Sequence, residues 1–202
     1  MTTGWAAVAA EAAPAGPATG LEYASAGRRL GAYIIDAVIV GTLAYFVTLP
    51  VWLPVMTDPT WAYDMAANPD AIWEFYQSPA WILAGVGSTV LHGLYFVLSW
   101  RLMRGSPGQR AVGLYLGDLE DGQPLPWGRA TLRWLALTWG PLVALVYLIP
   151  WPGWMIATVV LSLLVLVWQV VLLISVSSNP RRQGLHDRWA RSLIVRRAPL
   201  TG

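Results

Sequence analysis

The chain contains no cysteine, no lysine and only two histidines among its 202 residues. The absence of cysteine excludes disulfides, thiolate metal sites and a cysteine nucleophile, and His92 and His186 alone are too few for a zinc site built from imidazoles. Charged residues make up only 12% of the chain, about half the share usual in soluble domains. We therefore expect no metal, no cofactor and no enzymatic function.

Apolar and aromatic residues are abundant instead. Hydrophobic residues make up 56% of the chain, the mean hydropathy is +0.50, and there are 13 tryptophans. Tryptophan is enriched where membrane proteins meet the lipid headgroups. This composition predicts an integral membrane protein.

Four segments are long and apolar enough to cross a bilayer core about 30 Å thick as helices of about 20 residues. A short turn, Trp151-Pro152-Gly153, separates the last two and makes them an antiparallel hairpin. The predicted fold is therefore an all-α membrane bundle of four transmembrane helices. The predicted spans are residues 30–53, 79–100, 132–150 and 154–176.

The distribution of charge predicts the orientation. The loop between the first two spans, about residues 55–78, holds four acids and no arginine, whereas all thirteen basic residues are arginines elsewhere. By the positive-inside rule, that aromatic-rich loop is external and both termini are cytoplasmic. Arginine without lysine suggests a GC-rich bacterial genome, so the bacterial plasma membrane is the expected location. The C-terminal arginine cluster is expected to lie against anionic lipid headgroups, and no basic polar domain is available to bind nucleic acid.

The segments outside the spans are short. Residues 1–24 are predicted to be a disordered tail, residues 25–195 the membrane domain, and residues 196–202 a C-terminal tail. Between the second and third spans, Val112–Leu116 is typical of a strand, and residues 120–122 of a turn. We expect residues 125–127 to return and form a small cytoplasmic hairpin under the bundle.

Three motifs occur in a characteristic order. The first is RLGAYIID at residues 29–36, the second GSPGQRAVG at 105–113, and the third GLHDRWARSLIV at 184–195. In order and spacing they resemble the RDD family of bacterial membrane proteins, over about residues 25–195. The family is named for one arginine and two aspartates, which correspond here to Arg29, Asp36 and Asp187.

Two of the motifs depart from the family pattern. Ser106 and Gln109 stand where the family usually has threonine and a basic residue, and Arg191-Ser192 replaces a common Gly-Thr. Members of the family are generally described as transporters, and cation/proton antiport has been proposed for some. The resemblance implies the same class of function for this chain.

Asp36 is the most informative single residue. It lies about 9 Å inside the first span at 1.5 Å per residue, where a carboxylate must be protonated, paired or in contact with water. His92, Thr138 and Gln169 fall at similar depths on the other three spans and predict one polar layer. Asp36 and His92 are candidates for a proton- or cation-binding pair in that layer.

The other motif residues are candidates for a gate or charge pair. Arg29 and Asp187 would form a cytoplasmic gate, Arg133 is a second partner for Asp36, and His186 is expected to be exposed. The competing interpretation is that Asp36 is locked to Arg29 or Arg133 and the layer only joins helices. Two functions follow: a small transporter, oligomeric and coupled to a proton or monovalent cation, or a non-catalytic accessory or scaffold subunit of a membrane complex.

Overall fold

The computed structural model describes residues 20–68, 70–139 and 153–198. Within these ranges the chain is mostly helical, and three helices are long and apolar enough to cross a membrane. They are α2 (Ala26–Thr57), α5 (Pro79–Leu102) and α9 (Gly153–Ser178). These helices confirm the predicted spans 30–53, 79–100 and 154–176 as membrane-type helices.

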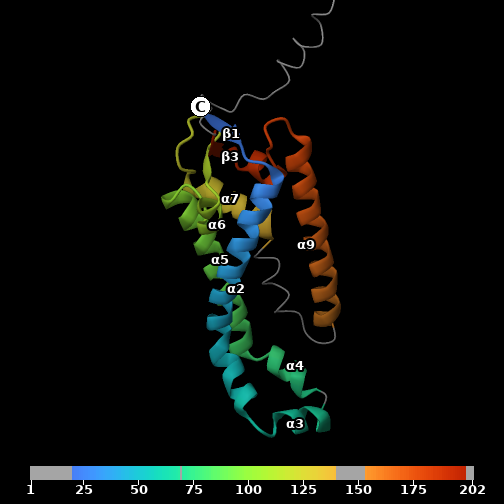
Figure 1. Cartoon of the computed structure of the whole chain (residues 1–202). Coiled ribbons are helices and arrows are strands. Elements are labelled where there is room, and N and C mark those ends of the chain that lie inside the picture. The colour runs from blue at the N-terminus through green and yellow to red at the C-terminus, as the bar shows by residue number, and fades with distance from the viewer. Residues whose placement is uncertain (1–19, 69, 140–152, 199–202) are drawn as a thin grey trace, which may run out of the picture.

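Helices α2 and α5 form the long axis of the molecule and lie side by side (Figure 1). Ser78 begins α5 by accepting a hydrogen bond from the backbone N–H of Trp81, and Pro79 at the first helical position needs no N–H partner. Helix α9 contacts α2, α7 and α10. Its buried residues Leu172 and Val176 lie near its C-terminal end, so this contact is made at one end of the molecule.

Two short helices occupy the opposite end, in the predicted external loop: α3 (Trp61–Ala67) and α4 (Ala71–Tyr76). The rings of Phe75 and Trp52 lie 5.0 Å apart, and Trp81 lies 5.3 Å from Trp52. These aromatic contacts join the loop to both long helices.

The predicted third span begins in α7 (Trp127–Thr138). This helix ends at Thr138, because Trp139 follows with a left-handed φ of 52° and its N–H bonds to the carbonyl of Leu135. The prediction of one continuous helix over residues 132–150 is therefore wrong at Trp139. Residues 140–150, which hold the rest of that span, lie outside the described residues.

A three-stranded antiparallel sheet, with strand order β1-β3-β2, lies at the end of the molecule opposite α3 and α4 (Figure 1). It consists of β1 (Leu21–Tyr23), β2 (Leu114–Asp118) and β3 (Ser192–Arg197). In the register, Leu116 of β2 faces Ile194 of β3, and both side chains are buried. The sheet therefore joins the start, middle and end of the chain.

The sheet corrects three predictions. The fold is not all-α. The predicted strand around Val112–Leu116 exists as β2, but its partner is β3 rather than a return at 125–127. The predicted tails, residues 1–24 and 196–202, are too long, because residues 21–23 and 196–197 belong to strands.

Two five-residue helices complete this end of the molecule: α6 (Pro107–Ala111) and α10 (Leu185–Trp189). Each contains the central part of one family-like motif, and each packs on a longer helix, α6 on α2 and α10 on α7. We call the sheet with α6, α7 and α10 the polar end of the molecule.

Candidate functional site

Asp36 is buried on α2, with 2% of its surface exposed, and it is held by neutral donors. The hydroxyl of Tyr95 on α5 donates to Oδ1 over 2.6 Å, and the backbone N–H of Gly108 donates to the same oxygen over 2.8 Å. The hydroxyl of Ser106 donates to Oδ2. The carboxylate thus fastens the 105–113 motif to α2.

The sequence GSPGQ gives this loop its shape. Ser106 and Gln109 form a capping box, in which Gln109 Oε1 accepts from the Ser106 backbone N–H over 2.9 Å. The same oxygen accepts from the indole N–H of Trp100 over 3.1 Å. Gly108 allows the close approach to α2, because a Cβ there would lie 2.3 Å from the carbonyl oxygen of Ala32. Ser106 and Gln109, the two residues of this loop that depart from the family pattern, therefore have a clear local role.

Asp187 on α10 is the centre of a second buried cluster. Arg29 donates to its Oδ2, and Arg133 donates to its Oδ1 from Nε over 3.1 Å and from Nη2 over 2.6 Å. The N–H of Gly184 also donates to Oδ2 over 3.1 Å. Asp187 has no exposed surface and Arg133 only 1%, and the Arg29 side chain is 10% exposed, so one carboxylate pairs with two guanidinium groups that are largely shielded from water.

Burial and charge set the titration of Asp187 and His186. Burial by itself would raise the pKa of Asp187, but the positive charges of Arg133 and Arg29, joined by that of His186 when low pH protonates its ring, outweigh burial and hold that pKa below its ordinary value. Burial lowers the pKa of His186 to about 4, so His186 is neutral at pH 7. Its Nε2 lies 3.3 Å from Asp187 Oδ1, and from this contact we infer that the neutral ring carries its proton on Nε2. The prediction that His186 is exposed was wrong.

The predicted polar layer is not one network among the described residues. His92 Nδ1 accepts a hydrogen bond from the indole N–H of Trp134 over 2.8 Å. In the part of the chain that the structure describes, His92 forms no hydrogen bond with Asp36. Thr138 donates to the Trp134 carbonyl, and Gln169 donates to the Leu137 carbonyl over 2.8 Å. The structure thus brings Arg29, Arg133 and Asp187 together, but it gives Asp36 and His92 separate partners.

Several important residues were missed in the sequence. In the sequence, Tyr95 and Trp100 are part of an apolar span, and the helical pattern does not identify their hydrogen-bonding partners. The capping box at Ser106 is the exception, because a serine followed three residues later by glutamine is a recognisable helix start.

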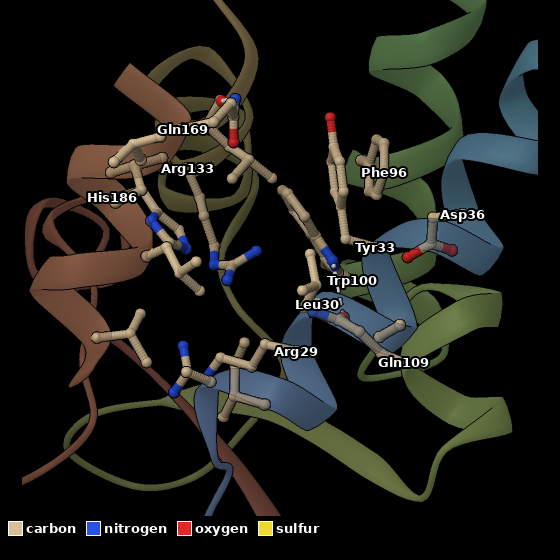
Figure 2. Close-up of a pocket in the computed structure, with 18 residues that line it drawn as sticks. Arg29, Leu30, Tyr33, Asp36, Phe96, Trp100, Gln109, Arg133, Gln169 and His186 are labelled. Carbon is tan, nitrogen blue, oxygen red and sulfur yellow. Dashed lines mark hydrogen bonds between the residues drawn. The ribbon is translucent and has the colours of Figure 1, made fainter. Parts of the chain in front are cut away.

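A pocket of about 220 Å³ lies between the Asp36 site and the Asp187 cluster. Figure 2 shows Trp100 near its middle, with Arg133 and His186 on one side and Asp36 on the other. The guanidinium carbon of Arg133 lies 4.4 Å from the centroid of the Trp100 ring, a cation–π distance. Most of the remaining wall is apolar, including Leu30, Phe96, Leu172 and Val176. Among the described residues, no group of three or more acids and histidines is placed to hold a metal ion.

Comparison with known proteins agrees with the motifs. The model of the RDD family matches residues 23–191, which is most of the chain. No curated protein and no solved structure gives a significant match.

Proposed function

The chain belongs to the RDD family, and on that premise we propose that it is a small transporter that binds a proton or a monovalent cation at Asp36. The observation that supports this proposal is a buried carboxylate bonded only to neutral groups, two hydroxyls and one amide. Among the described residues, no basic side chain forms an ion pair with it.

The electrostatic argument follows from the cost of burial. An unpaired carboxylate within a membrane span costs at least about 2.5 kcal/mol. Three donated hydrogen bonds offset part of that cost, but they do not neutralise the charge. A proton or a cation would do so, and Asp36 is open to one because it lines the pocket.

The two hydroxyls suit an exchangeable site. A hydroxyl can donate to a carboxylate or turn and accept, so Tyr95 and Ser106 can bond to either protonation state of Asp36. Their oxygens would also be ligands if a cation replaced the proton. The role first predicted for His92 passes to these residues, and the Arg29–Asp187–Arg133 cluster would form the closed gate beside them.

The proposed topology has four crossings, with both termini in the cytoplasm of a bacterium. It is supported by three apolar helices, by the arginines gathered at the polar end and by the acidic α3–α4 loop at the other. A single chain of this size offers few helices for a pathway, so we expect a homo-oligomer or a complex with other subunits.

The test is carbodiimide labelling of Asp36 in purified protein reconstituted in liposomes, over a range of pH, followed by proton-coupled Na⁺ and K⁺ flux. We expect labelling that Na⁺ or K⁺ suppresses, and flux that Asp36→Asn abolishes. Asp64→Asn, at an exposed acid on α3, is the control and should transport normally. No labelling at any pH short of unfolding would rule out an exchangeable site.

The second candidate is a non-catalytic accessory or scaffold subunit. It is favoured by the sheet, which joins three distant chain segments into one polar end, and by the cluster around the fully buried Asp187. Flux by the purified chain alone would exclude this role as its only function.

A further inference from the structure

The Asp187 cluster contains two buried polar atoms without partners. Among the described residues, Arg133 Nη1 and His186 Nδ1 form no hydrogen bond, although both lie in side chains that are more than nine-tenths buried. Leaving a buried polar atom unbonded costs about 1–3 kcal/mol, and more for a charged group. Both residues line the pocket beside Trp100 (Figure 2).

The two atoms require opposite chemistry. Arg133 Nη1 is a charged donor and needs an acceptor. His186 has its proton on Nε2, toward Asp187, so Nδ1 is an acceptor and needs a donor. A ligand that satisfies both has an acceptor oxygen and an O–H or N–H donor close together.

The charge of the cluster defines the ligand further. Arg29 and Arg133 contribute two positive charges and Asp187 one negative charge, while neutral His186 contributes none. The cluster is therefore one negative charge short of neutrality. A monoanionic oxygen would complete it, and the planar guanidinium group is well suited to a phosphate or carboxylate.

Most of the rest of the pocket wall is apolar, and residues of both α2 and α9 line it. Leu30 and Tyr33 of α2 and Leu173 of α9 line the pocket, and each is about half exposed on the outer surface. Both helices are of membrane-spanning type, so that surface faces lipid. A volume of about 220 Å³ corresponds to about seven waters of about 30 Å³ each. It holds a headgroup, and attached acyl chains would leave along the apolar helix faces.

We propose that this pocket binds the headgroup of an anionic glycerophospholipid from the adjacent leaflet, with the phosphate on Arg133 and a headgroup hydroxyl on His186. The lipid completes the charge of the Asp187 cluster and packs its chains between α2 and α9. The two polar contacts lie on the side of Trp100 away from Asp36 (Figure 2), so this proposal does not rest on ion binding at Asp36.

The experiment measures lipid binding to the full chain in detergent by native mass spectrometry, with phosphatidylglycerol and phosphatidylcholine as probes. The first has a net charge and hydroxyls in its headgroup, and the second has neither. We expect phosphatidylglycerol to bind at least tenfold more tightly. Equal binding of the two lipids would overturn the proposal.

Two matched variants test the location. Leu173→Trp fills the mouth of the pocket, whereas Ile174→Trp places the same side chain on the neighbouring, lipid-facing position of α9, which does not line the pocket. We expect the first to lose about tenfold in affinity for phosphatidylglycerol and the second to bind like the wild type. Equal affinities for the two variants would place the lipid elsewhere.

Two further arms test the headgroup. His186→Phe removes the acceptor without adding charge, and the preference for phosphatidylglycerol over phosphatidylcholine should fall while total lipid binding persists. An unchanged preference would contradict the assignment of the hydroxyl to His186. Glycerol 3-phosphate should not compete at lipid-binding concentrations, and effective competition would identify a site for a soluble anion instead.

Discussion

The two ends of the molecule are stabilised internally by different kinds of interaction. At the polar end, buried charges and hydrogen bonds join segments that are far apart in the chain, such as Arg29 and Asp187. Toward the α3–α4 end, the described hydrogen bonds of the spans are mostly local, as where Thr48 and Thr57 donate to carbonyls three or four residues earlier. Contacts between elements there include those of the Trp52 ring with Phe75 and Trp81.

This difference explains why the family motifs lie at one end. Packing of apolar helices in lipid tolerates many side chains, because lipid tails are as apolar as leucine. A buried ion cluster tolerates few, because removing one member leaves the others unpaired. The motif residues Arg29, Asp36 and Asp187 therefore fix the tertiary structure of the polar end, whatever else they do.

The largest loss of folding stability is expected for Asp187→Asn. It leaves Arg29 and Arg133 without their counter-charge in a buried site, and the loss should be about 3–5 kcal/mol of stability. Thermal unfolding in detergent would measure it. Glu120→Gln is the control, because its ion pair with Arg191 is exposed and should contribute less than about 1 kcal/mol. Similar losses for the two variants would mean that the cluster is not buried in solution.

The next effect is a loss of stability on acidification. The pKa of His186 is lowered from 6.5 to about 4 in the folded chain. Between these values the unfolded chain binds a proton that the folded chain does not, so stability falls as the pH falls from 6.5 to 4. The shift corresponds to a loss of about 3 kcal/mol of folding stability.

Thermal unfolding over that pH range would measure this loss, with His186→Gln as the comparison. The variant cannot titrate and should lose much less stability in the same window. A variant that follows the wild-type curve would assign the effect to other groups.

Gly108→Ala should destabilise the polar end by about 1–3 kcal/mol, the usual cost of overpacking. The added Cβ would lie 2.3 Å from the Ala32 carbonyl oxygen and 2.8 Å from Asp36 Oδ1. Gly128→Ala is the matched control, since nothing lies within 4 Å of a Cβ there. Unfolding midpoints in denaturant would compare them, and equal midpoints would show that the loop is not clamped to α2.

The sequence was sufficient for the apolar helices and for the identity of the motif residues. Hydropathy measures transfer into lipid directly, so α2, α5 and α9 were found within a few residues. The predicted depths of Asp36 and His92 in the membrane did not identify their hydrogen-bonding partners. Rise per residue gives a position along a helix, but hydrogen-bonding partners depend on rotation about the axis, and His92 turns to Trp134.

The sheet was beyond local reasoning. The turn predicted at 120–122 does form, since Gly122 has a φ of +66° and its N–H donates to Asp118. A local turn favours pairing of β2 with the chain that follows it. The actual partner, β3, lies more than seventy residues away, and its register places the buried Leu116 opposite the buried Ile194. Local patterns do not contain that information.

The smallest loss of stability is expected at the boundary between the hydrogen-bonded polar end and the apolar part of the helices. Gln169 of α9 donates to the Leu137 carbonyl of α7, so it bonds between helices at the edge of the polar end. Gln169→Leu should cost about 1 kcal/mol, the value typical of such bonds in membranes. Thr42→Val is the control, because Thr42 is exposed and donates only to the Val38 carbonyl within its own helix. Unfolding free energies in mixed micelles would separate the two: a cost for Gln169 alone extends the hydrogen-bonded network into α9, whereas equal, negligible costs would end that network at α7.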